Sequence, residues 1–116
     1  IWEGGTSYLQ IDPNYATTHG DARFALAFAR IENHYFVNGG FFEVEDQLLR
    51  DAHRIAGIPG VIVHGRYDVV CPIQNAFDLH KAWPKSELLV SAGSGHSGFE
   101  AENIAALVAA TDRFAG

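Results

Sequence analysis

Apolar residues recur at helical spacing in the first part of the chain and gather into short continuous runs in the second. Between Gly20 and Tyr35, the apolar residues Phe24, Phe28 and Ile31 share one face of a helix. Beyond residues 37–40 the pattern alternates between helical segments and short apolar runs typical of buried strands. The elements predicted for this second part are helix 43–56, strand 60–64, helix 72–83, strand 87–91 and helix 100–114.

Glycine and proline residues mark the ends of these elements. Gly57 and Pro59 stop the helix over 43–56. Pro72 suits the first turn of the next helix, and Pro84 follows its end. The order strand, helix, strand is a βαβ unit with parallel strands, and their continuous apolar runs are typical of strands buried on both faces. Because two parallel strands need neighbours and cover, we expect an incomplete part of an α/β fold.

The composition limits the size, compartment and partners of the protein. A chain of 116 residues is long enough for one domain. The formal net charge of −6, with only 8 scattered basic residues, argues against nucleic acid as a partner. No apolar run approaches the ~20 residues that span a bilayer, so no membrane partner is expected. The single cysteine, Cys71, cannot form an internal disulfide, which fits a reducing compartment.

Two polar residues follow the two predicted strands. Asp68 comes after the first strand, and His96 lies in the glycine-rich stretch GSGHSG after the second. A carboxylate there can accept the Nδ1–H of a histidine and fix its tautomer, so that the imidazole acts as a general base. The order Asp then His, each at the carboxyl end of a strand, is that of the last two members of an α/β-hydrolase triad.

Each of these residues also has a simpler interpretation. The simpler interpretation of Asp68 is that it caps the turn ahead of Pro72. That of His96 is an exposed loop histidine. Their joint placement around one βαβ unit favours the catalytic interpretation. The nucleophile elbow G-x-S-x-G, which precedes both residues in such triads, is absent from the sequence.

Other residues offer less chemistry. Cys71 is expected to be a small apolar filler, and Ser94 and Ser97 flank His96 without an elbow sequence. The six histidines show neither H-x-x-x-H nor H-E-x-x-H spacing, so no metal site is predicted. The glycines around His96 are weak evidence for a nucleotide-binding loop, and no cofactor is expected.

Three stretches together resemble one enzyme family. They are VIVHGRYDVVCPIQNAFDLHKAWPKSELLVSAGSGHSGFE at 61–100, WEGGTSYL at 2–9 and ALAFARIENHYFVNGGFF at 25–42. They are similar to the C-terminal segment of proline iminopeptidases, a branch of the α/β-hydrolase superfamily. The resemblance implies that residues 1–37 end a helical cap domain. It further implies that residues 38–116 form the C-terminal part of the hydrolase core, two parallel strands with flanking helices.

The resemblance also implies a reaction and a substrate. These enzymes remove an N-terminal proline from peptides, and Glu3 and Glu32 match the positions that bind the free amino end. Two carboxylates in a partly dry pocket would hold that positive charge. Tyr35 and Phe36 would line a proline-sized pocket, although Glu32 also fits an exposed helix position and the aromatic residues fit a core.

The serine nucleophile would belong to an N-terminal part that is missing here, so this chain alone is expected to be inactive. A cytoplasmic location follows from the resemblance and the lone cysteine. Three alternatives stay open. In the first, the chain is a piece of another cap-bearing hydrolase, such as an esterase or epoxide hydrolase. In the second it is a binding module without catalysis, and in the third it is an oligomerising fragment with an exposed sheet edge.

Overall fold

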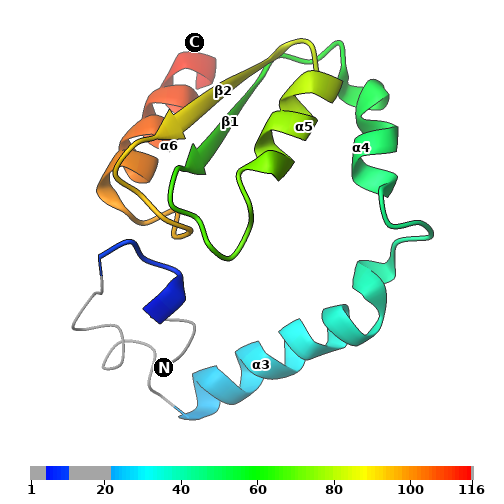
Figure 1. Cartoon of the computed structure of the whole chain (residues 1–116), viewed down its shortest axis with the longest axis vertical. Coiled ribbons are helices and arrows are strands. Elements are labelled where there is room, and N and C mark those ends of the chain that lie inside the picture. The colour runs from blue at the N-terminus through cyan, green and yellow to red at the C-terminus, as the bar shows by residue number, and fades with distance from the viewer. Residues whose placement is uncertain (1–4, 11–21, 116) are drawn as a thin grey trace.

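The computed structural model describes residues 5–10 and 22–115 of the chain. Its centre is a parallel sheet of two strands, β1 (Gly60–Gly65) and β2 (Ser86–Ser91). The strands pair in register along their whole length. Helix α5 (Gln74–Ala82) connects them, and α6 (Ala101–Ala115) follows β2. Figure 1 shows α5 and α6 on either side of the two strands, so the expected parallel βαβ unit is confirmed.

Helix α3 (Ala22–Val37) lies apart from this sheet (Figure 1). It is followed by a short 3-10 turn, η1 (Gly39–Phe41), whose three residues all have positive φ angles between 57° and 63°. Glycine adopts this left-handed region without penalty, whereas Phe41 is strained there. The Phe41 ring packs edge-on against Tyr35, with centroids 5.6 Å apart. This packing turns the chain sharply at the end of α3.

The prediction of a single helix over residues 43–56 is wrong. The structure has a short helix α4 (Gln47–Asp51) followed by a 3-10 helix η2 (Ala52–Ile55). The Glu43 N–H donates to Gln47 Oε1 at 2.9 Å, which keeps residues 43–46 outside the helix. Side-chain bonds of this kind compete with helical ones.

Little apolar surface is buried within the described residues. The only buried hydrophobic residues there are two alanines, Ala52 and Ala76. Helix α3 has no buried residue, and Phe28 and Ile31 on its apolar face are 47% and 62% exposed. The strands were expected to be buried on both faces, but most of their residues are half-buried, because α5 and α6 cover them only in part. The apolar faces of this chain therefore remain open.

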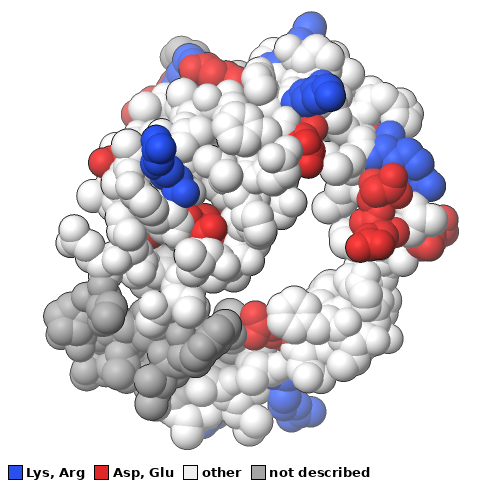
Figure 2. Space-filling model, viewed as in Figure 1, with Lys and Arg blue, Asp and Glu red and all other residues white. Residues whose placement is uncertain are grey.

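Charged residues are spread over the molecule. On the face shown in Figure 2, Lys and Arg side chains lie singly and alternate with Asp and Glu. An opening between α3 and the sheet is visible in the same view. Among the described residues, no helix is both long enough and apolar enough to cross a bilayer.

Candidate functional site

Backbone contacts bring the loops after β1 and β2 together. The Tyr67 N–H donates to the Ser94 carbonyl at 3.0 Å. Gly65, the last residue of β1, lies so close to Gly95 that a Cβ on it would overlap the Gly95 carbonyl oxygen. Only glycine permits this approach. The first residues after each strand are thus held side by side.

Asp68 uses its two carboxylate oxygens for different purposes. Oδ1 accepts the backbone N–H groups of Val70 at 3.0 Å and Cys71 at 2.8 Å, which closes a turn ahead of α5. Oδ2 lies 3.0 Å from Nδ1 of His96. The Asp68 side chain is only 6% exposed, whereas that of His96 is 38% exposed. The turn-capping and histidine-orienting interpretations of Asp68 therefore both hold, one for each oxygen.

The loop that carries His96 is fixed by side chains of the following helix. Asn103 Nδ2 donates to the carbonyls of Ser97 at 2.9 Å and Gly95 at 3.3 Å, and Asn103 is buried. Glu100 Oε1 accepts the Gly95 N–H at 2.7 Å. These bonds satisfy the backbone of a tight loop and hold the imidazole in place.

The segment 5–10 packs against the same loop. The Ser97 N–H donates to the Ser7 carbonyl at 2.7 Å, and Glu100 Oε2 accepts the Leu9 N–H at 3.0 Å. The Glu100 carboxylate thus joins two segments that are 91 positions apart in the sequence. Sequence reasoning missed both Glu100 and Asn103.

The Asp68–His96 pair is arranged for proton transfer. Partial burial opposes ionisation of Asp68, but the hydrogen bonds from the Cys71 N–H, from His96 and from the Val70 N–H outweigh it. The pKa of Asp68 is therefore lowered from its usual value. An ionised Asp68 accepts the Nδ1–H of His96, which leaves Nε2 of the neutral imidazole with a lone pair. Nε2 is then the atom that can take a proton from a nucleophile.

His64, on β1, is a further member of this cluster that sequence reasoning did not single out. Its Nε2 donates to the Cys71 carbonyl at 3.1 Å and lies 3.6 Å from Asp68 Oδ2. Its side chain is 13% exposed. The histidine fixes the turn that presents Asp68. Its position four residues before Asp68, in an otherwise apolar run, was the available signal.

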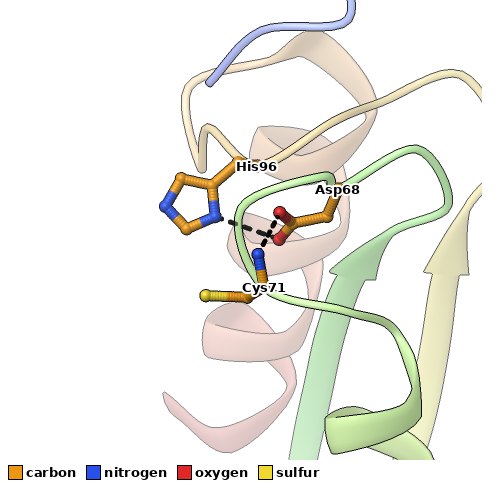
Figure 3. A group of neighbouring side chains, drawn as sticks. All are labelled: Asp68, Cys71 and His96. Carbon is orange, nitrogen blue, oxygen red and sulfur yellow. Dashed lines mark hydrogen bonds and ion pairs between the residues drawn. The ribbon is translucent and has the colours of Figure 1, made fainter. Parts of the chain in front are cut away.

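Cys71 is exposed in the described chain, so its expected role as an apolar filler is wrong. Its thiol lies beside the Asp68–His96 pair, as Figure 3 shows. One ligand atom each from Asp68, Cys71 and His96 lies within 4.8 Å of the others. Partial desolvation of the thiol by its neighbours, and then the negative charge of Asp68, raise the pKa of Cys71.

The serines beside His96 are not available as nucleophiles. Ser94 is 1% exposed, and its hydroxyl finds no hydrogen-bond partner within the described residues. Ser97 is buried, and its Oγ accepts the Phe99 N–H at 3.2 Å. Neither side chain is open to a substrate.

The structure does not bring the predicted substrate-binding residues into contact with Asp68 or His96. Glu32, Tyr35 and Phe36 all lie on α3, across the opening from the sheet (Figures 1 and 2). Glu32 is half-buried, while Tyr35 and Phe36 are 53% and 74% exposed. Glu3 lies outside the described residues. The pairing of Glu3 with Glu32 therefore stays a prediction.

A carboxylate and a histidine in the loops after adjacent parallel strands have the order and placement of the last two members of an α/β-hydrolase triad. The model of the α/β-hydrolase family described as "TAP-like protein" matches residues 33–114. The chain belongs to this family, which confirms the expected fold class.

Curated relatives narrow the comparison further. A protein named proline iminopeptidase from Xanthomonas citri is 76% identical over 115 residues, which cover 99% of this chain and 37% of that protein. A probable proline iminopeptidase from Leptolyngbya boryana is 59% identical over 98% of this chain and 36% of its own length. The proline iminopeptidase of Arabidopsis thaliana is 48% identical over 97% and 30%. The chain therefore spans about a third of the length of these relatives and corresponds to their C-terminal part.

Proposed function

We propose that this chain supplies the general base and its orienting carboxylate to a serine exopeptidase that releases N-terminal proline from peptides. The observation that carries the proposal is the 3.0 Å contact between His96 Nδ1 and Asp68 Oδ2 at the ends of two parallel strands. The names of the relatives support the substrate class. The nucleophilic serine then comes from sequence outside these 116 residues.

In this mechanism His96 Nε2 takes the proton of the serine hydroxyl while the serine oxygen attacks the carbonyl of the first residue. Asp68 stabilises the imidazolium that forms. Backbone N–H groups from outside this chain stabilise the oxyanion. The imidazolium then returns its proton to the leaving amine of the next residue. A water molecule, activated by the same imidazole, hydrolyses the prolyl ester and regenerates the serine.

Selection of the first residue is assigned to the cap. Residues 1–37 form the end of a helical cap domain in this proposal, and residues 38–116 form the C-terminal part of the core. Glu3 and Glu32 bind the charged proline nitrogen, and Tyr35 and Phe36 line the ring pocket. An apolar lining around a few polar groups is the usual composition of such pockets.

The partners of the chain are the peptide with its N-terminal proline and the upstream part of the same protein, in the cytoplasm. The open apolar faces of α3 and the sheet support the second partner, because such faces are normally covered. The chain alone should show negligible turnover, since loss of a triad nucleophile abolishes about as much catalysis as loss of the whole triad.

The test is a complementation assay with a chromogenic proline amide. We would assay the chain alone, the upstream two-thirds of the Xanthomonas citri relative alone, and both together. We expect activity in the mixture only. This activity should be lost when the proline nitrogen of the substrate is acetylated, and it should also be lost in His96→Gln. The matched control is His53→Gln, because His53 lies on η2 away from the site.

The other outcomes identify the alternatives. Turnover by the chain alone would refute the inference that the nucleophile lies outside this chain. Hydrolysis of esters or epoxides without proline amides would indicate another cap-bearing hydrolase. Saturable binding of proline amide without turnover would indicate a binding module, and a stable dimer in light scattering without ligand response would indicate an oligomerising fragment.

A further inference from the structure

Three different metal-binding side chains converge beside the strand ends. They are the carboxylate of Asp68, the thiol of Cys71 and the imidazole of His96 (Figure 3). One ligand atom from each lies within 4.8 Å of the other two. The thiol takes no part in the proposed proton transfer, so it is free to serve another purpose in this cluster.

The separations are close to those around a tetrahedral ion. Bond lengths of about 2.0–2.3 Å place tetrahedral ligand atoms roughly 3.3–3.8 Å apart. The largest separation in the cluster exceeds this range by about 1 Å at most. The Asp68 side chain is buried and fixed by the bonds of its turn, whereas His96 and Cys71 are exposed enough to rotate toward it. Small side-chain rotations therefore complete the geometry.

The surrounding hydrogen bonds orient these ligands in advance. The Cys71 N–H donates to Asp68 Oδ1, so two of the ligands belong to one closed turn. His64 Nε2 donates to the Cys71 carbonyl and fixes the same turn from β1. Outer hydrogen bonds of this kind commonly orient the ligands of metal sites.

The donor set selects the kind of ion. A thiolate, an imidazole and a carboxylate suit zinc, whereas magnesium and calcium prefer oxygen ligands alone. The charges of one thiolate and one carboxylate neutralise a divalent cation. Binding displaces the thiol proton to solvent. Three protein ligands leave a fourth position for water.

We propose that Asp68, Cys71 and His96 form a zinc-binding site that switches off the general base. The inhibitory consequence rests on the proposed function, whereas the binding itself does not. If Nδ1 binds the ion, its bond to Asp68 is lost. If Nε2 binds the ion, the lone pair that accepts the serine proton is occupied. Either arrangement removes the general base reversibly.

The experiment uses the chain joined to the upstream two-thirds of the Xanthomonas citri relative, with Co²⁺ and Zn²⁺ alone as probes. Co²⁺ should give a thiolate charge-transfer band that disappears in Cys71→Ser. Zn²⁺ affinity, measured by competition with a chromogenic chelator, should fall at least about 10-fold in Cys71→Ser, since loss of outer partners alone weakens metal sites by about 10–100-fold. The Zn²⁺ affinity of His96→Gln should fall by a similar factor, and His53→Gln should bind Zn²⁺ as wild type does.

Activity provides a separate readout. Zn²⁺ should inhibit proline amide hydrolysis, a chelator should restore it, and the inhibition constant should rise in Cys71→Ser by the same factor as the dissociation constant. A cobalt band unchanged in Cys71→Ser, or equal Zn²⁺ affinities, would overturn the site. A band that depends on Cys71 in a protein without peptidase activity would support the site and refute the proposed function instead.

Discussion

Replacement of Asp68 by Asn separates the two tasks of this carboxylate. Asn keeps an oxygen that can accept the N–H groups of Val70 and Cys71, so the turn before α5 should survive. Its amide NH₂ faces His96 instead of a charged oxygen. The histidine then loses both its tautomer control and its stabilising charge.

The size of the catalytic loss follows from the distance between the charges. At an effective dielectric constant of about 20, unit charges 3.0 Å apart interact by about 5.5 kcal/mol. At 1.36 kcal/mol for each factor of ten, this corresponds to a fall of ~10⁴ in rate. Because the His96 side chain is 38% exposed, water screens part of the interaction. We therefore expect kcat/KM to fall ~10³- to 10⁴-fold.

The assay is hydrolysis of a proline amide by the complemented protein, with thermal unfolding of each variant in parallel. Asp68→Asn should unfold within a few degrees of wild type, whereas Asp68→Ala should unfold earlier because it also loses the turn. Asp112→Asn, an exposed change on α6, is the matched control. A folded Asp68→Asn variant with kcat/KM within tenfold of wild type would refute the charge argument.

Three further predictions concern the same loops. Gly65→Ala should lower the free energy of unfolding by about 1–3 kcal/mol in chemical unfolding, because its Cβ would overlap the Gly95 carbonyl. The control Gly57→Ala has open space around its Cβ and should leave stability unchanged. Equal effects of the two substitutions would contradict the close approach of Gly65 to Gly95. Partial desolvation and then the charge of Asp68 raise the pKa of Cys71, so iodoacetamide should alkylate the thiol slowly at neutral pH and faster in Asp68→Asn. Unchanged alkylation rates would exclude the charge effect. The pKa of Asp68 is lowered in the folded state, so its stabilisation is present above the ordinary aspartate value of 3.8 and is lost as pH falls through the lower folded value. The Tm difference between wild type and Asp68→Asn should accordingly shrink in acid, and a difference that stays constant down to strongly acidic pH would show that ionisation is not its source.

The βαβ unit and its two functional loops could be predicted from the sequence because their signals are local. Apolar runs, Pro72 and Pro84 set the strands and α5 to within two residues. The late start of the helix at Gln47 could not be predicted, because it depends on a bond from the Glu43 N–H to the Gln47 side chain that competes with helical bonds. The half-exposure of the strands was also missed, since burial depends on neighbours that the described chain does not contain.

The site divides in the same way. Asp68 and His96 follow strands of one sheet, and parallel topology places such residues together. His64, Glu100 and Asn103 act through contacts between distant segments, and no spacing rule reveals them. Cys71 was assigned from residue type alone, which gives its usual environment but not the side of the turn on which its thiol lies.

The bonds made by Glu100 have a mechanical consequence. One carboxylate oxygen holds the Gly95 N–H beside His96, and the other holds the Leu9 N–H of the segment 5–10. A shift of that segment would therefore act on the loop of the histidine through the Glu100 side chain and through the Ser97 N–H bond to the Ser7 carbonyl. The position of the imidazole is therefore coupled to that of the segment 5–10, and Glu100 is the side chain that bonds to both.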